Sequence, residues 1–138
     1  MSEGARRPRW RLWLIRSLLI VAGLYILLLV ALVLNERRLL YFPHARVDRP
    51  PDSSVQVVAI DTADGERLVA WYRPPAPGRP VILFFDGNGG RLDYQWERWA
   101  ATRTVGVGQL SVAYRRYAGS TGAPTEAGLH EDARSAYR

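Results

Sequence analysis

The sequence contains no cysteine and no lysine, and these two absences narrow what the chain is able to do. Without cysteine there is no disulfide framework, no thiolate nucleophile and no cysteine-based zinc site. All nineteen basic residues are therefore arginine, and they are joined by only two histidines. The sequence accordingly predicts neither a metal site nor a cofactor.

The positive charge is placed unevenly along the chain. The net charge is +6, but residues 1–16 hold five arginines against one glutamate and so carry +4 of it. A basic flank beside an apolar segment accounts for the isoelectric point of about 10.3 better than a nucleic-acid surface does. We therefore expect no nucleic-acid partner.

Residues 17–34 form an apolar run without a single charge, and they contain thirteen leucine, isoleucine or valine residues. A helix of this length spans ~27 Å, close to the thickness of the hydrocarbon core of a bilayer. Those thirteen side chains favour insertion by roughly 4–8 kcal/mol. The run predicts a transmembrane helix, with the lipid bilayer as its partner.

A cleaved signal peptide is the alternative, because it also combines a basic start with an apolar run. The length of the run and the lack of a small-x-small cleavage site favour an uncleaved signal anchor. Arginines flank the run on both sides, with a slight excess before it. The positive-inside rule then predicts a single-pass protein of the inner (cytoplasmic) membrane, with its domain periplasmic or extracellular.

The aqueous part begins with a β-hairpin pattern. Residues 55–61 and 67–73 alternate as strands do, and Asp64 and Gly65 between them favour a tight turn. Residues 81–85, with the sequence VILFF, are apolar on both faces and predict a strand in the middle of a covered sheet. Residues 109–114 predict a further strand.

Two helices alternate with these strands. Residues 91–103 have apolar side chains at helical spacing, and we interpret the tryptophans in this stripe as core packing. The stripe consists of Leu92, Trp96, Trp99 and Ala100. The second helix covers residues 125–138 with Thr125 as its N-cap. Its predicted apolar stripe consists of Leu129, Ala133, Ala136 and Tyr137.

These elements predict an α/β fold in the order β-hairpin, β, α, β, α, preceded by one transmembrane helix. The predicted divisions are a basic tail (1–16), the transmembrane helix (17–34), a connector (35–54) and the α/β domain (55–138).

The segment most informative about function is DGNGG at residues 86–90, directly after the strand 81–85. Glycines in such a turn allow backbone N–H groups to converge on an oxyanion or a phosphate. A plain strand-to-helix turn is the alternative.

Together with YRRYAGSTG (114–122) and GAPTEAGLHEDA (122–133), this segment resembles membrane-anchored bacterial α/β-hydrolases of the serine esterase/peptidase-like group. The resemblance implies an incomplete α/β-hydrolase-type sheet and a serine hydrolase of acyl-ester or peptide bonds. It also implies that Asp86, Gly87, Asn88 and Gly89 form the oxyanion loop, with the Asn88 N–H as one donor.

The sequence departs from the family pattern at three positions. Asp86 replaces the family's histidine, and an ionised carboxylate there would oppose an oxyanion. Arg116 and Ala118 replace glycines, which could strain the turn.

No catalytic residue is predicted within these 138 residues. The family's Gly-x-Ser-x-Gly elbow, acid and histidine would come after the last helix. Ser120 in AGSTG is a poor nucleophile candidate, because it does not lie directly between a strand and a helix. His130, beside Glu131 and Asp132, is expected on a solvated face, and His44 is incidental.

Three functional hypotheses remain open at this point. The chain is a fragment of a hydrolase and inactive alone, or it acts on a small-molecule ester or peptide only when a missing half complements it, or it is a non-enzymatic membrane protein that uses the domain for binding. Without a neighbouring elbow strand, residues 81–85 would be an apolar edge, which predicts self-association.

Overall fold

The computed structural model describes residues 9–43, 49–50 and 53–138. The chain divides into two compact units, Met1–Glu36 and Arg37–Arg138. Helix α1 covers Arg9–Leu40, so its final turn belongs to the second unit.

Helix α1 extends past the charge-free run 17–34 at both ends. Its large apolar side chains are exposed on all sides, as expected for a helix without an apolar stripe. The stretch Trp10–Leu40 is long and apolar enough to cross a membrane, although an N-terminal signal sequence would have the same properties. Residues 35–40, which we assigned to the connector, are helical, and His44 lies outside the described residues.

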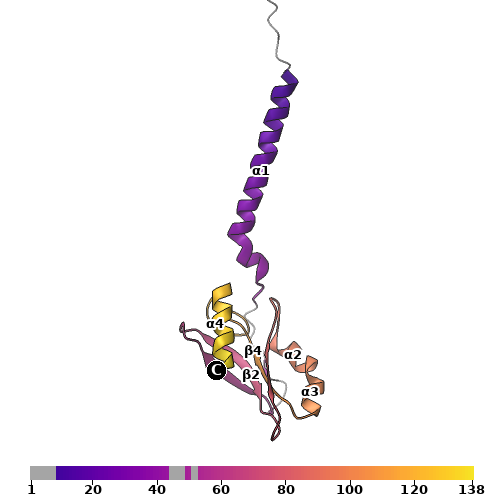
Figure 1. The fold of residues 1–138 in the computed structure, drawn as a ribbon, viewed down its shortest axis with the longest axis vertical. Helices are drawn as coiled ribbons and strands as arrows, with labels where there is room; N and C mark the ends of the chain where they lie inside the picture. Colours follow the sequence, from indigo (N-terminus) through magenta and orange to yellow (C-terminus); the bar gives the residue numbers. More distant parts are fainter. Residues whose placement is uncertain (1–8, 44–48, 51–52) are drawn as a thin grey trace, which may run out of the picture. The chain divides into compact units, whose positions relative to one another are not determined.

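The second unit contains a four-stranded mixed sheet (Figure 1), in which β1 pairs antiparallel with β2, β2 antiparallel with β4, and β4 parallel with β3. The strands in spatial order are β1 (Gln56–Asp61), β2 (Arg67–Arg73), β4 (Gly108–Val112) and β3 (Val81–Phe85). The predicted hairpin is confirmed, and Gly65 adopts a φ of 86° in its turn. The predicted α/β fold is also confirmed.

The two faces of the sheet pack into separate cores. On one face Leu68, Ala70 and Val112 are buried together, and Ala136 of α4 (Glu126–Tyr137) packs against them. On the other face Trp71 packs with residues of α2 (Leu92–Arg98). This alternation follows from the period of two in β2, whose successive side chains point to opposite faces.

The single helix expected over 91–103 is wrong: the structure has α2 and a separate short helix, α3 (Ala100–Thr104). Trp99 interrupts them with φ −99° and ψ 17°, outside the α-helical region. Its ring packs edge-on against Phe84, with centroids 5.2 Å apart. Trp96 packs against the core around Trp71, so the interpretation of both tryptophans as packing residues is confirmed.

Helix α4 begins as predicted, because the Thr125 Oγ1 accepts a hydrogen bond from the Gly128 N–H at 3.1 Å. Two expectations for its faces are wrong. Tyr137 is 85% exposed and lies outside the apolar stripe, whereas Asp132 is completely buried and lies on no solvated face.

Strand β3 was expected in the middle of a covered sheet, or at an edge where the elbow strand is missing, and within the described residues it is an edge strand. Val81 is 41% exposed and the other four side chains are only partly buried. Strand β4 ends at Val112, two residues before the predicted end, although the Ala113 N–H still donates to the Val69 carbonyl of β2 at 2.9 Å.

Candidate functional site

The candidate site lies beyond the carboxyl ends of β3 and β4. Because these strands are parallel, the segments that follow them emerge at the same edge, where α/β sheets bind ligands. A cavity of about 140 Å³ opens there. Its lining consists of Tyr41, Asp86, Gly87, Asn88, Tyr114, Tyr117 and Leu129. Three of the four predicted oxyanion-loop residues thus line one cavity.

Asn88 is held on both sides by hydrogen bonds. Its carbonyl oxygen accepts from the Tyr117 hydroxyl at 2.8 Å and from the Phe42 N–H at 3.1 Å. Its side-chain Nδ2 donates to the Leu40 carbonyl at 3.0 Å. Leu40, Phe42 and Tyr117 therefore position the loop that the resemblance assigns to oxyanion binding.

The backbone N–H of Asn88 has no acceptor among the residues that the structure describes. Asn88 is an exposed residue, and an N–H without an acceptor on a loop fixed by other bonds is the arrangement that an oxyanion donor needs. The role of the Asn88 N–H as an oxyanion donor stays a prediction.

The conformation of the loop does not by itself require glycine at positions 87 and 89. Neither has a positive φ, and an added Cβ at either would meet no atom within 4 Å. Gly90 differs, because its Cβ would lie 2.1 Å from the Cβ of Asp86. A requirement for glycine at 87 or 89 would have to come from a bound ligand approaching the backbone.

Asp86 is half-buried at the start of the loop, and burial raises its pKa to about 6. The nearby Arg98 charge opposes this effect, while Asp93 reinforces it. The carboxyl is therefore protonated below about pH 6 and ionised above it. At neutral pH the loop carries a negative charge near the place where the resemblance expects an oxyanion.

The two positions at which glycine was expected have left-handed backbone conformations. Arg116 has a φ of 71° and Ala118 a φ of 45°. Such angles cost an L-residue about 1–2 kcal/mol that glycine avoids. The predicted strain in this turn is confirmed.

Arg115 connects the loop after β4 to helix α4. Its guanidinium donates to Asp132 from Nε at 2.9 Å and from Nη2 at 2.6 Å, and its backbone N–H donates at 2.9 Å. Its Nη1 reaches Asp64 of the hairpin turn at 2.9 Å, and this bond lowers the pKa of Asp64. One buried arginine thereby joins three segments that are far apart in sequence.

Gly128 makes room for this arginine. A Cβ at position 128 would lie 2.5 Å from Nη1 of Arg115. The YRRYAGSTG and GAPTEAGLHEDA segments therefore fit together physically: the first supplies the arginine, and the second supplies its carboxylate in Asp132 and the space in Gly128.

Ser120 has a structural role. Its hydroxyl donates to the Ala113 carbonyl and accepts from the Val69 N–H, both at 2.9 Å, and the residue is 7% exposed. A hydroxyl occupied in this way offers no nucleophile to solvent, as expected from its place in the loop. His130 is exposed on α4.

Sequence reasoning missed the aromatic wall of the cavity. Tyr114 and Tyr117 line it, and burial raises the pKa of both hydroxyls, which keeps them protonated at neutral pH. Tyr117 was visible in the YRRY motif, but its bond to Asn88 depends on the folding of two distant loops. Within the described residues, no group of three or more His, Asp or Glu is placed to hold a metal ion.

Solved structures with a similar fold include an alpha-beta hydrolase from Vibrio vulnificus, with a TM-score of 0.54 and 23% identity over 67% of this chain and 36% of that one. A Pyrococcus furiosus esterase gives a TM-score of 0.55 with 19% identity over 70% of this chain and 40% of its own. The domain has an α/β-hydrolase-like fold. At these identities the likeness establishes the fold alone.

By sequence, the α/β-hydrolase-like domain is similar to the uncharacterized protein Rv2307c of Mycobacterium tuberculosis, with 40% identity over 108 residues. That match covers 74% of this chain and 38% of the relative. No family model matches the chain. The chain spans about two fifths of the length of the curated relatives that it matches.

Proposed function

We propose that this chain supplies the membrane anchor and the oxyanion loop of a serine hydrolase that acts on acyl-ester or peptide bonds. The observation that carries the proposal is the backbone N–H of Asn88, which has no acceptor among the described residues while the carbonyl and side chain of Asn88 are fixed by hydrogen bonds. A donor held in this way needs no reorganisation when negative charge develops on a substrate oxygen.

The tyrosines and Leu129 give the cavity an apolar side suited to an acyl or side-chain group. A cavity of about 140 Å³ accommodates only a small part of a substrate, so the substrate's remainder would contact surfaces outside these residues. The substrate is accordingly a small-molecule ester or peptide bound in a complemented site.

The 138 residues contain no Gly-x-Ser-x-Gly segment, and the hydroxyl of Ser120 is occupied by structural bonds. We therefore expect this stretch by itself to be inactive, because no activated hydroxyl faces the loop. A fluorophosphonate probe tests this directly. Labelling of the 138-residue chain that is lost on Ser120→Ala would refute the proposal.

The activity itself is tested on a longer polypeptide. The DNA beyond codon 138 is read for a Gly-x-Ser-x-Gly elbow followed by an acid and a histidine, and the extended protein is assayed on short-chain esters. Tyr117→Phe in that protein should lower kcat more than it raises KM, because it loosens a loop that acts in the transition state. An extended protein with an elbow but no esterase or peptidase turnover would contradict the proposal.

Residues 17–34 of α1 would anchor the protein in the inner membrane, with the domain in the periplasm or outside the cell. Resistance to alkaline carbonate extraction tests the anchor. Alkaline phosphatase fused after residue 138 tests the orientation, since it is active only outside the cytoplasm. An inactive phosphatase fusion on an anchored chain would reverse the orientation.

One observation favours a non-enzymatic binding module as the second candidate. Asp86 introduces a carboxylate into the loop, and above about pH 6 its charge would repel an oxyanion. Replacing Asp86 with histidine in the extended protein distinguishes the two functions. A gain of turnover supports the hydrolase, whereas no turnover in either form supports the binding module.

A further inference from the structure

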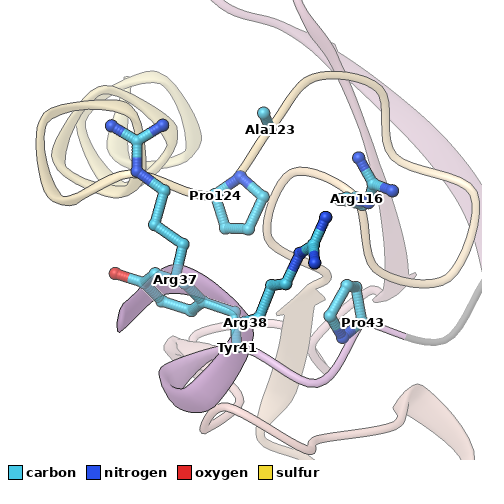
Figure 2. Close-up of a pocket in the computed structure, with 7 residues that line it drawn as sticks. All are labelled: Arg37, Arg38, Tyr41, Pro43, Arg116, Ala123 and Pro124. Atoms are coloured by element: carbon cyan, nitrogen blue, oxygen red, sulfur yellow. The ribbon is translucent and has the colours of Figure 1, made fainter. Parts of the chain in front are cut away.

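A second and larger cavity, which shares Tyr41 with the cavity at the oxyanion loop, lies between the last turn of α1 and the loop that precedes α4. Its volume is about 390 Å³, in the range of pockets that hold small ligands. Three arginines line it: Arg37, Arg38 and Arg116. In Figure 2 the side chains of Arg37 and Arg38 extend on either side of Pro124, and Arg38 reaches toward Arg116.

Among the residues that the structure describes, no carboxylate balances the three charges. The other residues that line the cavity carry no charge, and within the described part of the chain none of these guanidinium groups forms a salt bridge. Three like charges around one hollow repel one another, so an anion bound there would stabilise the arrangement. Guanidinium groups are matched in geometry to the oxygens of phosphate.

The strained backbone of Arg116 is a second observation that indicates a ligand in this cavity. Its backbone has a φ of 71°, which glycine would adopt without strain, and its guanidinium forms no salt bridge with the described residues. A strained residue persists where its side chain has a use, and the use visible here is a third guanidinium at the cavity.

The position of the cavity along the chain points to the membrane surface. Arg37 follows Leu34, the last residue of the apolar run, by three residues, which span at most ~11 Å even when fully extended. If residues 17–34 cross the hydrocarbon, Arg37 and Arg38 of the cavity lining are held close to the level of the lipid phosphates.

We propose that this cavity binds the phosphate of an anionic phospholipid headgroup. The inference rests on the proposed membrane anchor but not on the proposed hydrolase activity. Binding a headgroup would hold the domain against the bilayer at a second point besides the helix.

The test uses the full chain in nanodiscs that contain equal amounts of phosphatidylglycerol and phosphatidylcholine, with retained lipids counted by native mass spectrometry. We expect phosphatidylglycerol to be enriched on the order of tenfold. Arg37→Gln, Arg38→Gln and Arg116→Gly should each lower the enrichment about fivefold, the effect of one arginine at an anionic surface. Equal retention of both lipids by an anchored wild-type chain would overturn the proposal.

Two variants serve as controls. Ala118→Gly relieves backbone strain in the same turn without changing charge, and Arg79→Gln removes a charge from a loop that does not line the cavity. Both should retain the wild-type enrichment. Arg116→Gly should raise the stability of the fold while lowering enrichment, a combination that a purely structural role for Arg116 excludes.

The source of the phosphate and the state of the anchor are measured separately. Inorganic phosphate added to the nanodiscs should not displace phosphatidylglycerol, and full displacement at equal affinity would assign the site to a free phosphate instead. Carbonate extraction reports whether the chain is anchored. A chain that is extracted refutes the anchor and with it this inference, whereas an anchored chain without enrichment refutes this inference alone.

Discussion

The carboxylate of Asp132 lies completely buried against Arg115, where it accepts hydrogen bonds from both the guanidinium and the backbone N–H of that residue. The pair joins helix α4 to the loop after β4, and Asp64 extends it to the hairpin turn. This contact holds together one wall of the candidate site, because Tyr114, Tyr117 and Leu129 belong to the two segments that it joins.

Replacing Asp132 with asparagine should lower the free energy of unfolding by about 3 kcal/mol, since it leaves a buried guanidinium without its main counter-charge. The measurement is urea denaturation of the full chain in detergent micelles, followed by tryptophan fluorescence. Glu131→Gln is the matched control: its partner Arg134 is 3.8 Å away and exposed, so the change should stay within about 0.5 kcal/mol. Equal effects of both substitutions would show that the buried pair contributes no special stability.

Replacing Gly128 with alanine should destabilise the fold by about 1–3 kcal/mol, because its Cβ would displace the Arg115 guanidinium. The same substitution at Gly87, where a Cβ meets open space, is the control and should have little effect on stability. Urea denaturation measures the free energy of unfolding of both variants. A neutral Gly128→Ala would mean that Arg115 moves aside without cost.

Replacing Ala118 with glycine should stabilise the chain by about 0.5–1 kcal/mol, because the strain at φ 45° exceeds the extra flexibility that glycine adds to the unfolded chain. Gly119→Ala is the converse control and should destabilise, since Gly119 has a φ of 91°. Thermal unfolding by circular dichroism measures both. Destabilisation by Ala118→Gly would indicate that packing of the buried methyl group outweighs the strain.

Replacing Asp86 with asparagine should remove a pH dependence of stability between about pH 4 and pH 6. The folded pKa of about 6 lies above the ordinary value of 3.8, so the folded state binds the proton more tightly and stability falls as pH rises through this window. After allowance for solvent screening of a half-exposed group, we expect a gain of about 1 kcal/mol at pH 7.5 and none at pH 4. An equal gain at both pH values would assign the effect to something other than ionisation.

Residues 35–138 expressed alone should self-associate through β3, an apolar edge strand with uncharged side chains. Val81→Lys places a charge on that edge and should shift the protein toward monomer in sedimentation velocity runs. Val57→Lys tests the opposite edge, formed by β1. If Val57→Lys yielded monomer and Val81→Lys did not, the interface would be assigned to β1. A monomeric wild-type domain would refute the association.

Local patterns in the sequence were sufficient for the elements that depend on near neighbours. Asp64 and Gly65 predicted the hairpin, Thr125 predicted the start of α4, and the charge-free run predicted a long apolar helix. Turn chemistry, capping and periodicity act within a few residues, so these features can be read from one segment at a time. Strain at Arg116 and Ala118 was also predictable, because the glycine pattern of similar proteins marks backbone positions.

Tertiary structure alone decided where the charged and aromatic groups go. The sequence alone predicts that Asp132 is exposed. In the folded chain Arg115, from another segment, pairs with Asp132, and a carboxylate is buried only where such a partner compensates its charge. Trp99 breaks a helix that its spacing favours, because its ring packs on Phe84. Likewise, the sequence contains Arg37 and Arg116 without any sign that they line one cavity, since only the folded loops bring them together.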